Sequence, residues 1–433
     1  MVKKSFGVTI IFVISTFIQL ISQIVVTRLF GASFELDVFL AAVALPTIIV
    51  TVIYGTLNDV LLPVLSEQKN KEPQGFNKFF TKTFVFLGSV ITLLSLLLFF
   101  FSAPISELLY QSRGEQFIKA VTQQMTFMAW SYPLAIVATF FGSYYYLHKN
   151  YVRFPLAQLI GSAANVLIIL LFATQLGIWA LVIAFVFNIL IQIIFVLPPS
   201  RIFSLSDLLP DKKDIQAMFS IIFTWLPLML GYFALRSDSL LVRSLGSSLP
   251  TGSLVHLNLI FRIFSLATSI MTIGFQIVLL PQLIEDFNKK NYLKAALDVR
   301  KFKFITLGIS IVITLITILL IPYVINLLFV GGKFSQKDAL NTLKFIPLFI
   351  LPAIGWGINN IFFQPLIALK KQKELGILNI IAFTLAWLTV FVCIKYFTPQ
   401  MAISTGLITL LFTGIIGSEF LWQRYKKELL TGR

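Results

Sequence analysis

The segment RLFGAS at residues 28–33 returns as RSLGSS at residues 243–248, half a chain later. Two further pairs keep nearly the same spacing: LLPVLSE at 61–67 with LLPQLIE at 279–285, and, more loosely, 104–110 with 322–329. The two halves therefore repeat in the same direction, offset by 215–219 residues. In an apolar protein this predicts two similar helical lobes around a central cavity, as in many secondary transporters.

The composition places the chain in a membrane. Hydrophobic residues make up 58% of the 433, charged residues only 12%, and the mean hydropathy is +0.91, whereas soluble domains carry about 25% charged residues. Apolar runs long enough to cross a ~30 Å hydrocarbon core recur throughout. We therefore expect an all-α polytopic membrane protein with about twelve spans. Their approximate ranges are 6–30, 36–62, 80–103, 121–147, 155–174, 177–197, 217–245, 252–283, 303–330, 343–368, 375–396 and 400–422.

The domain organisation follows from the repeat and the loops. Residues 1–199 are expected to form an N-terminal six-helix lobe, 200–216 a cytoplasmic linker and 217–433 a C-terminal six-helix lobe. Pro198-Pro199 and DLLPD at 207–211 are typical of a linker. The polar segments 107–122 and 332–344 carry apolar residues at helical spacing, so a short interfacial helix is expected in each.

The basic residues predict the orientation. By our count 24 of the 34 Lys and Arg fall on one side of the twelve spans. The positive-inside rule makes that side cytoplasmic, so both termini are expected inside the cell. The formal charge of +16 is then mainly a topology signal, and nucleic-acid binding is not expected.

The chemistry-bearing residues exclude several classes of protein. The chain has two histidines far apart, a single cysteine, Cys393, and no carboxylate cluster at metal-ligand spacing. It has no Gly-x-x-x-x-Gly-Lys-Ser/Thr loop for nucleotide phosphates. A disulfide, a metal centre, an ATP-driven pump and a membrane enzyme are therefore poorly supported. No cofactor is expected, and Na⁺, H⁺ or the membrane potential would drive transport.

Charges inside spans are the candidate binding residues, because a charge at mid-membrane costs about 2.5–3.5 kcal/mol even on the lenient insertion scale. Arg262 lies about ten residues into the eighth span and shares a helix face with Asn258. Its position and lack of a neighbouring acid suit an anionic ligand, since a guanidinium binds phosphate bidentately. Arg236 and Asp238 lie in the seventh span, where they could also neutralise each other structurally.

The remaining charged candidates have structural alternatives. Arg28 and its repeat mate Arg243 lie nearer the outer surface, where they could act only as anchors that snorkel to the headgroups. Asp59 and Glu419 lie near the inner ends of their spans and could be interfacial. Asp59 and Asp238 are the candidates for ion coupling.

Prolines within spans are the candidate hinges. Pro46, Pro133 and Pro227 interrupt the second, fourth and seventh spans, and Pro352 is one of three prolines in the tenth. Such breaks free backbone carbonyls and let a helix bend during alternating access. Static kinks that only serve packing are the alternative.

Several motifs resemble one known family. They are LFGA at 29–32 with Asp37 and Phe39, Leu45-Pro46 and Leu62-Pro63, then LPTGS at 249–253 with Leu257-Asn258 and Arg262, and finally Leu328-Phe329 with GKF at 332–334 and Asp338-Ala339. Together they resemble the lipid II flippases of the MurJ/MviN family, in the multidrug/oligosaccharidyl-lipid/polysaccharide exporter superfamily. The resemblance implies two six-helix lobes, a central cavity and a bacterial cytoplasmic membrane. It also implies flipping of an undecaprenyl-pyrophosphate-linked saccharide, with cell-envelope biosynthesis proteins as partners.

The chain departs from this family's pattern in three ways. Members of the family typically have fourteen helices, whereas twelve are expected here. The arginines that hold the pyrophosphate in the first two helices correspond to Thr16, Ser22 and Val50, so Arg262 alone carries over clearly. Some members bind sodium through an aspartate in helix seven, which Asp238 matches, but Ala386 and Val390 stand at the expected partner positions.

The sequence therefore predicts a flippase for lipid II or a related lipid-linked oligosaccharide that works by alternating access. The headgroup would be held by Arg262 and Asn258, with Arg236, Arg243 and Arg28 nearer the exit, and the prenyl tail would stay among the membrane lipids. A cation-coupled drug or metabolite exporter of the multidrug-efflux branch is one alternative, and it predicts an acidic cavity. A non-transporting envelope-assembly scaffold is the other, and an open lateral portal would count against it.

Overall fold

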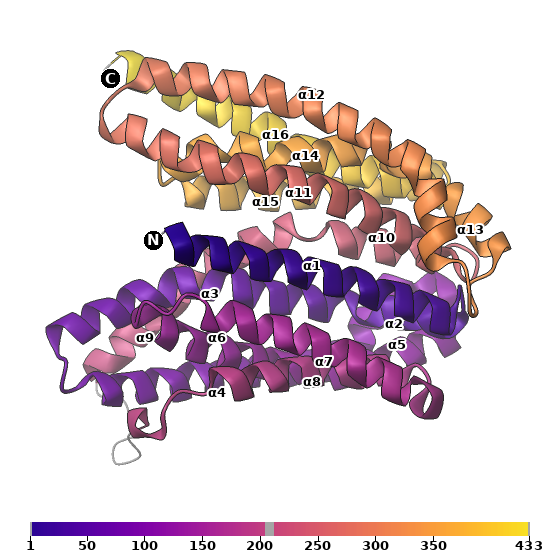
Figure 1. Ribbon diagram of the computed structural model, residues 1–433, viewed down its shortest axis with the longest axis horizontal. Helices are drawn as coiled ribbons and strands as arrows, with labels where there is room; N and C mark the ends of the chain where they lie inside the picture. The colour runs from indigo at the N-terminus through magenta and orange to yellow at the C-terminus, as the bar shows by residue number, and fades with distance from the viewer. Residues whose placement is uncertain (1, 204–211, 432–433) are drawn as a thin grey trace. The chain divides into compact units, whose positions relative to one another are not determined.

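The computed structural model describes residues 2–203 and 212–431 and is almost entirely helical (Figure 1). Apart from an isolated bridge between Gly331 and Phe334, the described residues form no β-structure. The middle of the expected linker, residues 204–211, lies outside the described residues.

The chain divides into two compact units, Met1–Met229 and Leu230–Arg433, with the boundary inside α9. Unit 1 holds α1 (Val2–Phe30), α2 (Phe34–Ala42), α3 (Ala44–Lys71), α4 (Phe76–Tyr110), η1 (Gln111–Arg113), α5 (Glu115–Met128), α6 (Ser131–Leu147), α7 (Arg153–Leu176), α8 (Trp179–Val196), η2 (Ser200–Ile202) and most of α9 (Lys212–Leu235). Unit 2 holds the end of α9, α10 (Asp238–Gly246), α11 (Ser253–Asn288), α12 (Tyr292–Val324), η3 (Ile325–Phe329), α13 (Gln336–Leu343), α14 (Ile346–Ala368), α15 (Gln372–Tyr396) and α16 (Pro399–Thr431). The lobe boundaries expected from the sequence stay a prediction.

The spans confirm a polytopic membrane protein. Within the described residues, eleven helical segments are long and apolar enough to cross a membrane. The eighth expected span corresponds to α11, a helix of 36 residues that contains the apolar segment Ser253–Ser269. The short helix expected at 332–344 is present as α13, which begins with a capping box between Ser335 and Asp338. The segment 107–122 instead divides among the end of α4, η1 and the start of α5, which belongs to the fourth span.

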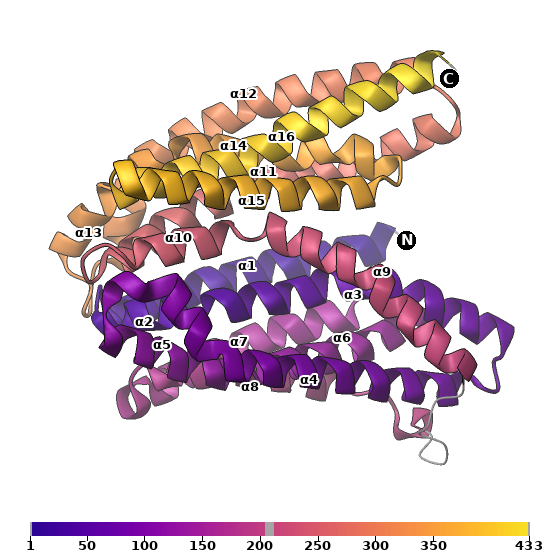
Figure 2. The same cartoon turned by 180° about the vertical axis from the view of Figure 1, so that it is seen from behind.

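The internal repeat is visible in the packing of each unit. In unit 1, α6 packs against α3, α4, α7 and α8. In unit 2, α14 occupies the equivalent place among α11, α12, α15 and α16 (Figures 1 and 2). Each central helix comes from the same point in its half of the sequence. The two units therefore share one helical plan, as the offset repeats predict.

Three of the expected spans are interrupted, and prolines explain two of the breaks. A proline at position i clashes with the carbonyl of residue i−4 and cannot donate to it. Pro46 therefore ends α2 at Ala42, and Pro133 ends α5 near Ala129, and each proline then sits in the tolerant first turn of the next helix.

The expected interruptions at Pro227 and Pro352 do not occur, while the role of these prolines as hinges stays a prediction. Both lie inside continuous helices, α9 and α14. The seventh span breaks instead at Arg236–Ser237, nine residues beyond Pro227 and with no proline downstream in α10. This break positions the charged residues considered next.

A close approach of two helices fixes the end of α9 within unit 2. A Cβ atom on Gly231 would lie only 2.6 Å from the Cα of Gly376 in α15. Small residues at such crossings are typical of membrane helices, because close backbone contact replaces the missing hydrophobic drive between helices. Gly231 thus holds the last turn of α9, and the break that follows it, against α15.

Candidate functional site

The break between α9 and α10 places an acid at a new helix N-terminus. Asp238 is the first residue of α10, where the helix dipole favours a negative charge. Its Oδ1 accepts a hydrogen bond from the Ser239 N–H at 2.8 Å, and its Oδ2 accepts one from Trp356 Nε1 at 3.0 Å. Trp356 belongs to α14, so the central helix of unit 2 orients the Asp238 carboxylate.

Two arginines lie close to this carboxylate, and both attract it electrostatically. The side chain of Arg236 lies against Tyr232 one turn back in α9, with its Nη2 donating to the tyrosine hydroxyl at 3.2 Å and its guanidinium 5.3 Å from the ring centre. Mutual neutralisation of Arg236 and Asp238 through a partner helix stays a prediction. Discontinuous helices that present charges at the break are a recurrent feature of transporter binding sites.

Arg243 joins α10 to α11. Its Nη2 donates to Asn258 Oδ1 at 3.2 Å, and the side chains are 5% and 1% exposed. This burial differs from what an arginine reaching out to lipid headgroups would show. The sequence did not predict that Asn258 contacts Arg243.

Arg262 lies one turn beyond Asn258 on the same face of α11. Its Nε is buried and has no hydrogen-bond partner among the described residues. The preceding Phe261 packs edge-on against Trp356, with ring centres 5.2 Å apart. The packed rings of Phe261 and Trp356 therefore connect the residue next to Arg262 with the side chain that donates to Asp238.

The other predicted site residues belong to unit 1. Arg28 is exposed in the last turn of α1, and Asp59 is exposed in α3. Near Asp59, Asn58 accepts a hydrogen bond from the Ser143 hydroxyl of α6 at 2.6 Å. Glu419, in unit 2, forms an ion pair with Lys303 of α12.

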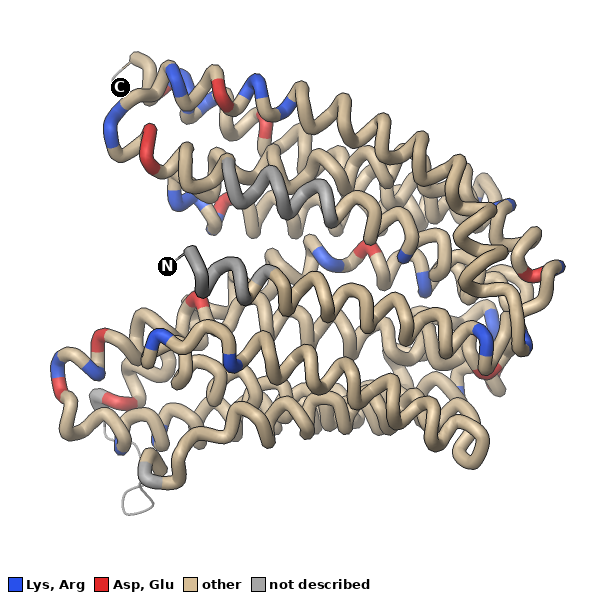
Figure 3. The backbone as a smooth tube through the Cα atoms, viewed as in Figure 1, with Lys and Arg blue, Asp and Glu red and all other residues tan. Residues whose placement is uncertain are grey.

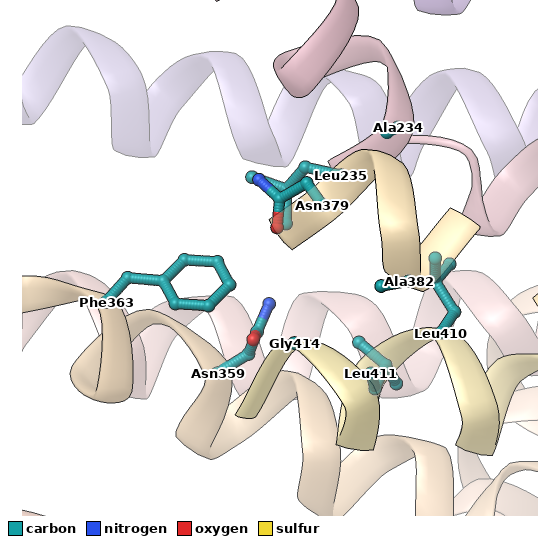
Figure 4. A pocket seen from close by; sticks show the side chains of 9 residues that line it. All are labelled: Ala234, Leu235, Asn359, Phe363, Asn379, Ala382, Leu410, Leu411 and Gly414. Atoms are coloured by element: carbon teal, nitrogen blue, oxygen red, sulfur yellow. The ribbon is translucent and has the colours of Figure 1, made fainter. Parts of the chain in front are cut away.

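A small pocket inside unit 2 is distinct from the charged cluster (Figure 4). The side chains of Asn359 and Asn379 face it from α14 and α15, with Phe363 beside them. Its volume of about 10 Å³ is room for one water molecule. The pocket is therefore far too small for a saccharide headgroup.

Comparison with known proteins assigns the chain to a family. The model of the family described as "Lipid II flippase MurJ" matches residues 26–432. The chain belongs to the lipid II flippase MurJ family. A probable lipid II flippase MurJ from Borreliella burgdorferi is 25% identical over 373 residues, covering 84% of this chain and 73% of that protein. One from Helicobacter pylori strain J99 is 27% identical over 171 residues, which are 40% of this chain and 36% of that protein.

Solved structures agree on the fold. A lipid II flippase MurJ in an inward closed conformation superposes with a TM-score of 0.78 at 18% identity, covering 99% of this chain and 89% of the other. An inward-facing multidrug resistance MATE transporter of the MOP superfamily reaches the same TM-score at 13% identity, covering 96% of each chain. This chain therefore has the fold of both solved transporters, and the fold alone does not distinguish a flippase from a multidrug transporter.

The sodium site that the MurJ resemblance suggests does not fit these residues. Asp238 accepts two N–H donors and is attracted electrostatically by two arginines, whose charges would repel a cation. Ala386 and Val390, at the expected partner positions, are buried and supply no side-chain oxygen, whereas hard cations require several oxygen ligands. No group of three or more His, Cys, Asp or Glu comes together in the described part of the chain.

Sequence reasoning missed several polar residues of unit 2. Trp356 and Tyr232, which orient Asp238 and Arg236, were not singled out because amphipathic aromatics are common in apolar spans. Asn359 and Asn379 carried a usable signal, since amides inside apolar helices are rare and usually have a reason.

Proposed function

We propose that this MurJ-family chain flips a polyprenyl-pyrophosphate-linked saccharide across the bacterial cytoplasmic membrane by alternating access. The observation that carries the proposal is Arg262, a guanidinium inside an apolar helix whose buried Nε has no partner among the described residues. A charge is retained at such a place when a ligand uses it. A pyrophosphate supplies the planar pair of acceptor oxygens that a guanidinium binds bidentately.

Arg236, Arg243 and Asn258 would extend the headgroup site along α9, α10 and α11 of unit 2. Asp238 is proposed to be their internal counter-anion in the absence of substrate. Its carboxylate attracts the same two arginines that a phosphate would attract, so substrate binding would exchange one anion for another. Because one anion would replace another, the arginine charges would be neutralised both with and without bound substrate.

The orientation is part of the proposal. The excess of Lys and Arg at the ends of α11 and α16 and the starts of α12 and α15 supports a cytoplasmic position for that end of unit 2. Both termini would then be cytoplasmic. Cell-envelope biosynthesis proteins that supply or consume the lipid-linked saccharide are the proposed partners.

The driving force is proposed to act without a bound cofactor or Na⁺. The poor fit of Asp238 to a sodium site supports this. The membrane potential or a proton gradient would then drive flipping. Replacing Na⁺ by N-methylglucamine should leave flipping unchanged, while valinomycin and nigericin separate the two driving forces.

The test is flipping in proteoliposomes with fluorescent lipid II and a short undecaprenyl-pyrophosphate glycan. Arg262→Ala should slow flipping at least tenfold, because a hydrogen bond to a charged group contributes about 1.5–3 kcal/mol. Arg262→Lys should recover part of the rate, since it keeps the charge and loses the fork. The lipid that the wild type prefers would identify the substrate.

Arg424→Ala is the matched control, since Arg424 lies exposed at the end of α16 and pairs with Glu428. It should flip at the wild-type rate. If folded Arg262→Ala flips as fast as the wild type, the headgroup assignment is wrong. If the wild type moves neither lipid but exports cationic dyes, the efflux alternative replaces the flippase, and if it moves nothing at all, the scaffold alternative gains.

A further inference from the structure

One end of unit 2 carries a large excess of positive charge. This lysine-rich end is formed by residues 285–303, 370–374 and 419–431, at the end of α11, the starts of α12 and α15 and the end of α16 (Figure 3). It contains twelve Lys and Arg but only six Asp and Glu. The surplus exceeds what the local acids can neutralise.

The ion pairs show which cations remain available. Five cations pair with acids: Lys289 with Glu285, Lys294 with Asp286, Lys303 with Glu419, Lys371 with Glu374, and Arg424 with Glu428. The sixth acid, Asp298, accepts a hydrogen bond from Gln282 at 2.6 Å. Seven cations have no ion-pair partner among the described residues, and all but the half-buried Lys426 are exposed: Lys290, Arg300, Lys301, Lys370, Lys373, Lys426 and Lys427.

Backbone strain marks two of these lysines. Lys290 and Lys370 each have φ of 59°, in the left-handed region that glycine occupies most easily. Each follows the end of a helix, α11 or α14, and the next residue donates back to a carbonyl of the last turn, as in a Schellman motif. A residue with a side chain costs about 1 kcal/mol more than glycine there. These lysines therefore place charge where conformation alone would favour glycine.

The flanking residues place this charge at the edge of the hydrocarbon. On α12, Arg300 and Lys301 are exposed and come directly before a long apolar stretch whose first exposed aromatic is Phe304. Lys426 of α16 acts electrostatically on Lys303, so the two helices present charge at a similar level. The hydrogen bond with Tyr425 raises the pKa of Lys371 in the loop between α14 and α15.

We propose that the lysine-rich end of unit 2 binds the phosphate headgroups of anionic phospholipids in the surrounding leaflet. The free cations come from the ends of several helices and are spread over this end of unit 2 (Figure 3), which suits several lipid headgroups better than one soluble anion. Juxtamembrane Lys and Arg attract anionic lipids in this way. The surface is distinct from Arg262 and does not depend on the proposed transport function.

The test measures lipid binding by the full chain in a neutral detergent, with tryptophan-to-dansyl energy transfer to dansyl-phosphatidylglycerol. The test variant combines Lys301→Gln, Lys370→Asn and Lys427→Gln, with asparagine chosen because it tolerates positive φ. Each lysine should contribute about fivefold to affinity, so the triple variant should bind roughly a hundredfold more weakly. Binding by the wild type should fall as the salt concentration rises.

The control removes three exposed lysines at the opposite end of unit 2, with Lys333→Gln, Lys337→Gln and Lys395→Gln. It should bind phosphatidylglycerol as the wild type does. Equal binding by the test variant and the wild type would overturn the proposal, as would equal affinity of the wild type for dansyl-phosphatidylcholine. Displacement by inorganic phosphate beyond that by NaCl at equal ionic strength would indicate a free-phosphate site and would overturn it too.

Discussion

Replacing Gly231 by alanine tests how the broken helix α9–α10 is held in place. The added Cβ would lie 2.6 Å from the Cα of Gly376 and 3.3 Å from its carbonyl carbon and oxygen. Carbon atoms in contact prefer about 3.5–4.0 Å. The two helices would therefore have to separate by about 1 Å, and the contact cannot be relieved by a rotamer change because both partners are backbone.

Two opposing contributions set the change in stability caused by Gly231→Ala. Forced overpacking costs about 1–3 kcal/mol, while alanine gains about 1 kcal/mol over glycine in a helix. Gly308→Ala in α12 is the matched control, because nothing lies within 4 Å of its added Cβ. It keeps the helix gain without the overlap, so Gly231→Ala should be about 1–3 kcal/mol less stable than Gly308→Ala.

Thermal unfolding of the purified variants in one detergent provides the measurement. Unfolding of a membrane protein is often irreversible, so apparent midpoints should be compared at one scan rate. We expect Gly308→Ala to unfold at or above the wild-type midpoint and Gly231→Ala below it. If Gly231→Ala is as stable as Gly308→Ala, the close packing of α9 on α15, and the positioning of the break that rests on it, would be refuted.

Three further predictions concern single interactions. Asp37 and Arg113 form a 2.6 Å ion pair whose side chains are 0% and 11% exposed. Asp37→Asn alone should therefore destabilise the protein by about 3 kcal/mol, and the double variant with Arg113→Gln should lose less than the sum of the two single variants. Additive losses in this double-mutant cycle would argue against the pair. Trp356→Phe removes a hydrogen bond to Asp238, so it should lower stability by about 1–2 kcal/mol and slow flipping. An unchanged flipping rate would show that transport does not depend on how Trp356 orients Asp238. Phe80→Ala empties a fully buried site in unit 1 and should cost about 3–5 kcal/mol, measured by thermal unfolding; a loss below 1 kcal/mol would contradict its core position.

The fold was predictable because the signals that specify it are redundant. Apolar runs of membrane-crossing length recur, and the paired segments near residues 28 and 243 give the duplication directly. The structure confirms both in the helical spans and in the equivalent neighbours of α6 and α14. Prolines were informative only where they fell early in a helix, as Pro46 does, because an interior proline is tolerated in a long membrane helix.

The site was less predictable because tertiary contacts decide it. Nothing in the sequence marks Arg236–Ser237 as a helix break, since no proline lies in α10 beyond it. The hydrogen bond from Arg243 to Asn258 joins two helices across a loop, and the hydrogen bond from Trp356 to Asp238 joins residues 118 positions apart. Charge inside a span is readable from the sequence, but the partner of that charge is not.

The departures from the MurJ pattern have a consequence for how an anion would be held. In unit 1 the positions corresponding to the missing arginines carry a threonine whose hydroxyl donates to Phe12 O at 2.9 Å, a serine, and Val50, which is 8% exposed. These side chains add no cation. Arg236 and Arg243, beside and within α10, belong to unit 2, where the carboxylate of Asp238 attracts both. If unit 2 holds the headgroup charge, neutralising its arginines should abolish flipping of fluorescent lipid II in proteoliposomes.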